Sequence, residues 1–135
     1  MSTQVTLTSD ARSAQANALI PLLNSGFIKI YSGAIPASVS APRGAAVLLA
    51  TCPLNVASAP VTTTGTLTFD MTGVEDDSID ADGTATFYRT YEADGLTPVT
   101  QGSVGLDGSG ESMTMASIDL VENGTLIISS FTHTV

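Results

Sequence analysis

The sequence predicts an all-β fold, an antiparallel β-sandwich of the jelly-roll or immunoglobulin-like type with one short N-terminal α-helix. Segments of β-branched and aromatic residues recur about every 8–15 residues, which is typical of a sandwich of about six to eight short strands. About a quarter of the 135 residues are Ser or Thr and 12 are Gly, a composition that favours strands and turns. Only one stretch, near the N-terminus, has helical spacing.

The length of 135 residues fits one domain with a sizeable core. We expect residues 1–8, which are polar, to form an N-terminal arm, and residues 9–135 to form a single β-sandwich domain. The helix is expected at about 9–24. Ser9-Asp10 offers an N-cap, and Asn24-Ser25-Gly26 offers a stop with a left-handed position at Gly26. Pro21 should kink or end the last turn because it removes a backbone hydrogen bond.

Strands are expected from residue 27 onward. The segments with strand character are 27–31, 45–54, 65–71, 84–91, the stretch after Pro98 up to Gly105, 112–121 and 125–135. Residues 83–105 are expected to form two extended segments joined by a turn at Asp94-Gly95, and we expect this pair to be central to the fold. Asn123-Gly124 is the strongest hairpin signal in the chain.

The strand at 84–91 is expected to have two unlike faces. Alternation places Ala85, Phe87 and Tyr91 on one face, and Thr84, Thr86, Tyr88 and Thr90 on the other. Arg89 falls on the apolar face, so we expect its guanidinium to be paired or to lie near a rim.

Charge and composition exclude several classes of partner. The formal net charge is −9, and the four basic residues are scattered at Arg12, Lys29, Arg43 and Arg89. A nucleic-acid surface needs clustered Lys and Arg, and so does attraction to an anionic membrane, so we expect neither partner. The start of the chain does not resemble a signal peptide, and a single cysteine allows no intramolecular disulfide.

An acidic loop at residues 75–82 is the one candidate metal site. Asp and Ser alternate before Gly83 as in a calcium loop, but Arg89 stands where an EF-hand requires a bidentate acid. A non-EF calcium site formed from Glu75, Asp76, Asp77, Asp80 or Asp82 is one interpretation. The other is a solvated loop whose Asp side chains cap turns, and we favour it.

No reactive constellation stands out elsewhere, so we expect no enzyme activity, no catalytic residues and no cofactor. Cys52 lies in an apolar run and is expected to pack as a small hydrophobic residue. His133 is the only histidine, and no nucleophile elbow accompanies it, so we expect a strand residue at a sheet rim or interface. The sequon at Asn123 is better explained as part of an Asn-Gly turn.

Several segments, in this order, resemble a family of small virion proteins of tailed bacteriophages. After a short Ala-rich helix, residues 29–36 match K/R-I-Y-x-G-x-x-P, and residues 48–52 match L-L-A-x-x. Residues 83–89 match a G-T-A-x-x-[FY]-R strand, and residues 94–105 match a D-G hairpin that ends in G-S-V-G. The last strand is Thr-rich. The resemblance covers most of the chain, and Pro21 and the acidic loop at 75–82 depart from the pattern.

This resemblance implies a non-enzymatic virion structural protein, assembled in the host cytoplasm. The expected role is a capsid decoration or cement protein that docks on the assembled shell, with the major capsid protein or another virion protein as its partner. A homo-oligomer is expected. The alternative is a tail- or fibre-associated module that binds a host surface or another tail protein. The resemblance carries no catalytic residues to transfer.

Overall fold

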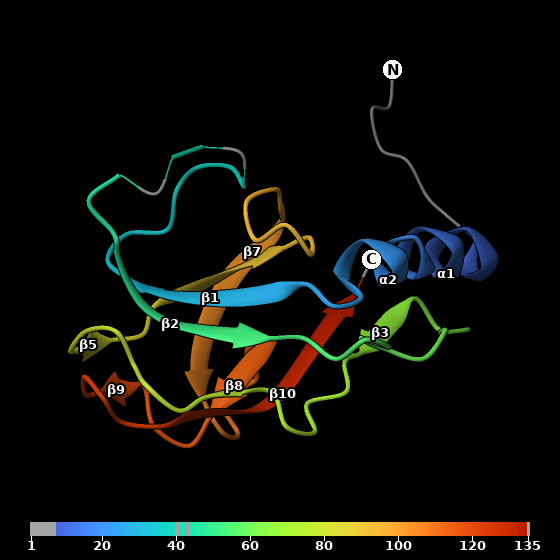
Figure 1. Ribbon diagram of the computed structural model, residues 1–135. Coiled ribbons are helices and arrows are strands. Elements are labelled where there is room, and N and C mark those ends of the chain that lie inside the picture. The colour runs from blue at the N-terminus through green and yellow to red at the C-terminus, as the bar shows by residue number, and fades with distance from the viewer. Residues whose placement is uncertain (1–7, 40, 43, 135) are drawn as a thin grey trace.

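The computed structural model describes residues 8–39, 41–42 and 44–134 (Figure 1). It has the predicted all-β fold with one short N-terminal helix. The predicted arm at residues 1–8 lies outside the described residues, apart from Thr8. Neither helical segment of the described chain has the length and apolar character needed to span a bilayer.

The helix is interrupted at Ala18, which separates α1 (Ser9–Asn17) from α2 (Leu19–Leu23). The Pro21 ring is incompatible with a helical carbonyl four residues earlier, at Asn17, so the break falls where a proline effect is expected. The N-cap is Thr8, one residue before the predicted Ser9-Asp10 cap, and its Oγ1 accepts a hydrogen bond from the Ala11 N–H at 3.1 Å.

The helix ends differently from the prediction. Ser25 adopts the left-handed conformation, with φ of 58°, in place of Gly26. Gly26 is required for another reason, because a Cβ there would collide with the backbone oxygen of Tyr91. Two asparagines of the helical region, Asn17 and Asn24, bond to the loop at residues 55–64, which follows β2. Asn17 exchanges two hydrogen bonds with the Thr62 backbone, and Asn24 Oδ1 accepts from the Ser58 N–H.

Ten strands follow the helix. They are β1 (Phe27–Ser32), β2 (Val47–Pro53), β3 (Thr66–Thr68), β4 (Glu75–Asp76), β5 (Gly83–Thr84), β6 (Phe87–Tyr91), β7 (Pro98–Leu106), β8 (Met113–Met115), β9 (Asp119–Leu120) and β10 (Leu126–Thr134). Eight of them form one sheet in the order β2-β1-β6-β7-β8-β10-β3, with β4 also paired to β10. The other two, β5 and β9, pair with each other.

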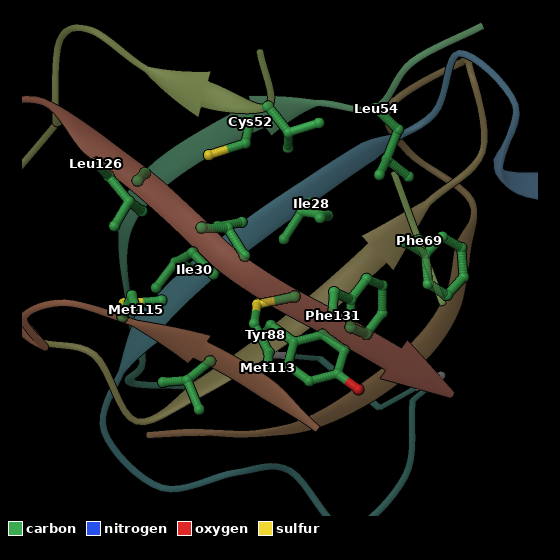
Figure 2. Packing of buried hydrophobic residues seen from close by; sticks show 14 of the residues in the cluster. Ile28, Ile30, Cys52, Leu54, Phe69, Tyr88, Met113, Met115, Leu126 and Phe131 are labelled. Atoms are coloured by element: carbon green, nitrogen blue, oxygen red, sulfur yellow. The ribbon is translucent and has the colours of Figure 1, made fainter. Parts of the chain in front are cut away.

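The sheet folds over on itself, so that β10 runs across β1 and β2 with the main core between them (Figure 2). The predicted organising pair is present as β6 and β7, which align Arg89 with Gln101 and Thr90 with Thr100. Gly95 takes a positive φ of 70° in the turn that joins them.

Three local predictions were wrong. The sheet is mixed, because β7 and β8 run parallel. The Asn123-Gly124 turn forms, with Asn123 at φ 68°, but it is not a hairpin turn, since β9 pairs with β5 while β10 pairs with β8, β3 and β4. The acidic loop contains a short strand, β4, where we expected none.

The main core consists largely of Leu, Ile, Met and aromatic side chains. Met113 and Met115 are fully buried, as is Leu67 in β3. At one end of the core, the Phe131 ring stacks on Phe69 at a centroid distance of 4.4 Å and meets Tyr88 edge-on at 5.1 Å (Figure 2). Tyr88 lies over Gly102 on β7, where a Cβ would come within 2.7 Å of its hydroxyl oxygen.

Replacement of Phe131 by Ala should lower the free energy of unfolding by about 3–5 kcal/mol, because it removes the ring on which two aromatic contacts depend and leaves a cavity. The matched control is Ile127→Ala on the same strand, whose side chain is 59% exposed. This control should cost less than about 1 kcal/mol. Urea unfolding of both variants makes the comparison, and equal losses would contradict the assignment of Phe131 to the core.

Candidate functional site

The outer face of β1, β6 and β7 carries a second apolar cluster, separate from the main core. Every residue of β6 is buried, so this strand is covered on both sides. On the side away from the main core, Phe87 and Tyr31 stack at a centroid distance of 5.0 Å and pack with Ala46. The segment at residues 33–46, here named the covering loop, lies on this side (Figure 1), and among its described residues Ala46 packs in this cluster.

The alternation predicted for residues 84–91 is confirmed within β6, where Phe87 and Tyr91 share one face and Tyr88 and Thr90 the other, and it is wrong for Ala85. The face that looks toward the main core carries Tyr88 and Thr90, and Phe87 lies on the other face in the second cluster. Ala85 joins the main core together with Tyr88, because the chain is not a regular strand between β5 and β6. The alternation rule fails where the strand is interrupted.

Arg89 is paired, as predicted, and is only 5% exposed. Its Nε donates to Gln101 Oε1 at 3.0 Å, and its Nη2 donates to the backbone oxygens of Ser38 and Ala41. These acceptors are neutral. None of the hydrogen bonds that Arg89 makes in the described chain is to a carboxylate.

The covering loop is held at further points. Gln101 accepts from Arg89 and donates through Nε2 to the Pro36 backbone oxygen at 2.8 Å. Thr86 Oγ1 donates to the Gly33 backbone oxygen at 2.7 Å. Backbone oxygens of the covering loop thus accept hydrogen bonds from side chains on β6, on β7 and from Thr86 just before β6.

Lys29 lies directly opposite Arg89 across the β1–β6 pair. Its Nζ donates to the Gly95 backbone oxygen at 2.9 Å and sits 4.6 Å from the centroid of the Tyr91 ring. The Tyr91 hydroxyl is 2.9 Å from the hydroxyl of Tyr31. These groups line an open pocket of about 420 Å³, together with Leu48 and Leu96.

The acidic loop uses its side chains to cap backbone groups. Asp76 accepts from the Thr51 N–H at 2.9 Å and from the Ser78 N–H at 2.9 Å, and Asp82 accepts from the Glu122 N–H at 2.7 Å. The capping interpretation is thus confirmed at these two positions. Within residues 8–39, 41–42 and 44–134, no three His, Cys, Asp or Glu side chains group in a way that could hold a metal ion.

Cys52 and His133 occupy the expected places. Cys52 is fully buried in the main core, and burial, with smaller contributions from Asp76 and Glu75, raises the pKa of its thiol to about 12. A thiol so protonated is a poor nucleophile. His133 lies near the end of β10, paired with Leu67 of the edge strand β3, and burial lowers the pKa of its imidazole.

The segments that carry the family resemblance meet on this outer face. Lys29, in the segment at residues 29–36, bonds to Gly95 in the segment at residues 94–105. Arg89, in the segment at residues 83–89, bonds to Gln101, which in turn bonds to Pro36. Sequence reasoning treated these segments as separate turn and strand signatures and missed the juxtaposition of Lys29 and Arg89. A signal was present, since each is a lone basic residue inside an apolar strand.

No family model matches the chain, and no curated protein or solved structure matches it.

Replacement of Arg89 by Lys should lower the free energy of unfolding by about 2–4 kcal/mol. A lysine has no planar fork, so it leaves some of the Gln101, Ser38 and Ala41 oxygens without donors. Arg12→Lys on the exposed side of α1 is the matched control and should change stability by less than about 0.5 kcal/mol. The midpoints of urea unfolding compare both variants with the parent. An Arg89→Lys variant as stable as the parent would show that the guanidinium does not hold the covering loop.

Stability should fall as the pH drops from 7 toward 5. The pKa of His133 in the folded chain is below its ordinary value of 6.5, so the unfolded chain binds this proton more readily. The stability that comes from keeping His133 neutral is fully present above the pKa of the unfolded chain. It is lost as the pH falls from there through the lower pKa of the folded chain. Urea unfolding at several pH values should give a slope that His133→Gln removes, and an unchanged slope in that variant would assign the effect to other groups.

Proposed function

We propose that this chain is a non-enzymatic structural protein of a tailed-bacteriophage virion, and specifically a decoration or cement protein that docks on the assembled shell. The observation that carries the proposal is the convergence of the resembling segments. Residues 29–36, 83–89 and 94–105 lie side by side and bond to one another, so they act as one structural unit.

The mechanism is stabilisation by mass action. A protein that binds the assembled shell and not its free subunits shifts the equilibrium toward the assembled state. Many copies on a symmetric shell add avidity. The central strand of this β-domain is buried on both faces, so the domain is rigid and loses little conformational entropy on docking.

The distribution of aromatic residues favours decoration over the alternative of a tail- or fibre-associated module. A module that binds carbohydrate on a host surface is expected to expose aromatic rings at loop tips. The 4 Phe and 3 Tyr residues lie in or beside strands, and none of them is exposed. Docking through apolar and Thr-rich surfaces fits this arrangement better.

One apolar surface suits such docking. Val121 and Ile127 are 65% and 59% exposed, and both line an open pocket of about 330 Å³ at the β9–β10 end of the molecule. The pocket lining also includes Leu120 and Leu126. Large exposed apolar side chains beside a pocket are typical of protein interaction sites.

Co-sedimentation with shells of the major capsid protein from the same phage tests the function. The chain should pellet with assembled shells in a saturable ratio and should remain in solution with unassembled capsid protein. Ile127→Asp should weaken binding by at least about tenfold, because a buried unpaired charge is costly. Val61→Asp is the matched control, since Val61 is 76% exposed on a different loop. Failure to pellet with any shell would reject the decoration role.

A further inference from the structure

We propose that the pocket beside Lys29 and Arg89 is a binding site for an organic carboxylate with an apolar body. The pocket lies on the outer face of β1 and β6 and has a volume of about 420 Å³, within the range of small-molecule sites. This inference does not depend on the virion function, because it rests only on the charges and donors at the pocket.

The placement of positive charge is the first argument. The chain has 13 acidic and only 4 basic residues, yet two of the four basic side chains face each other across β1 and β6. Like charges directly opposite on neighbouring strands destabilise a sheet. None of the interactions of Lys29 and Arg89 within the described chain is with a carboxylate. A bound anion would offset this repulsion.

Unused donors are the second argument. The Lys29 ammonium has three N–H donors and makes one hydrogen bond in the described chain, to the Gly95 oxygen. Arg89 uses Nε and Nη2 for Gln101 and the covering loop, whereas its Nη1 makes no hydrogen bond to any described residue. Both side chains line the pocket, so a carboxylate placed there can accept from both.

The apolar residues that line the pocket favour a carboxylic acid with an apolar body. Leu48 and Leu96 are apolar lining residues of the pocket, and Leu96 is 78% exposed although it is a large hydrophobic residue. Tyr31 and Tyr91 add aromatic surface, with their hydroxyls 2.9 Å apart. Covering this apolar surface with a ligand gives a favourable burial that a bare inorganic anion cannot supply.

Phosphate is the less suitable anion. A phosphate dianion carries two negative charges, and it would meet a molecule whose net charge is −9. The neighbouring turn carries Glu92 and Asp94, and the Asp94 carboxylate already accepts from Leu96 and Thr97. A singly charged carboxylate meets less repulsion from these acids.

A purely structural role for Lys29 is the competing explanation. By bonding to the Gly95 oxygen and covering Tyr91, the ammonium could serve only to fix the turn after β6. That role needs no ligand, so a direct titration separates the two explanations.

The test is an NMR titration of the full-length ¹⁵N-labelled chain with benzoate, with benzamide as the uncharged control. Benzoate should shift the amides of Lys29, Leu48, Gly95 and Leu96 in a saturable way, with a dissociation constant on the order of 1 mM, as expected for so small a ligand. Lys29→Gln should weaken binding at least about tenfold, and Lys29→Arg should retain it. Arg12→Gln removes the same charge from α1 and should leave binding unchanged. Arg89 is kept in every variant because it holds the covering loop.

Several results would overturn the proposal. Equal shifts with benzamide would show that the carboxylate is not recognised, and equal weakening by Lys29→Gln and Arg12→Gln would show non-specific attraction. Saturable binding of inorganic phosphate without binding of benzoate would reject the carboxylate class. If Lys29→Gln does not fold, Leu96→Ser provides a second variant, since it keeps both cations and should weaken benzoate binding by removing an apolar wall.

Discussion

The outer layer of this protein depends on a buried guanidinium with neutral partners. Burying a charge without a counter-ion is costly, and the hydrogen bonds of Arg89 to Gln101, Ser38 and Ala41 offset part of that cost. The same bonds satisfy backbone oxygens of the covering loop. The loop can therefore lie over β6 and bury Phe87 and Tyr31 on the side away from the main core.

A strand buried on both faces has consequences for the rest of the molecule. The pairing of β6 with both β1 and β7 places residues from distant segments in one layer, so Lys29, Arg89 and Gln101 align across three strands. The 92–97 turn then positions Gly95 and Leu96 beside Lys29. The pocket is thus a product of strand register, and its two cations are fixed by the same register that builds the fold.

Much of the fold could be predicted from sequence, because local signals determine it. The helix region, β1, β2 and the β6–β7 pair follow from spacing, β-branched runs and the Asp94-Gly95 turn. Strand partners could not be predicted, since pairing is non-local: Asn123-Gly124 forms its turn, yet the strands it joins pair elsewhere. The burial of Cys52 and the capping by Asp76 were predictable from local pattern. The Lys29–Arg89 pair was not, because it depends on the register of strands about 60 residues apart.

The exchange rate of the Arg89 Nε–H with solvent tests the central claim most directly, by NMR of arginine side chains. The chain has three arginines, and Arg89→Lys identifies the relevant signal. A proton that donates to Gln101 Oε1 on a 5% exposed side chain should exchange at least about a hundredfold more slowly than that of free arginine. An exchange rate equal to that of free arginine would mean that the guanidinium is open to water and that the covering loop is held by other contacts.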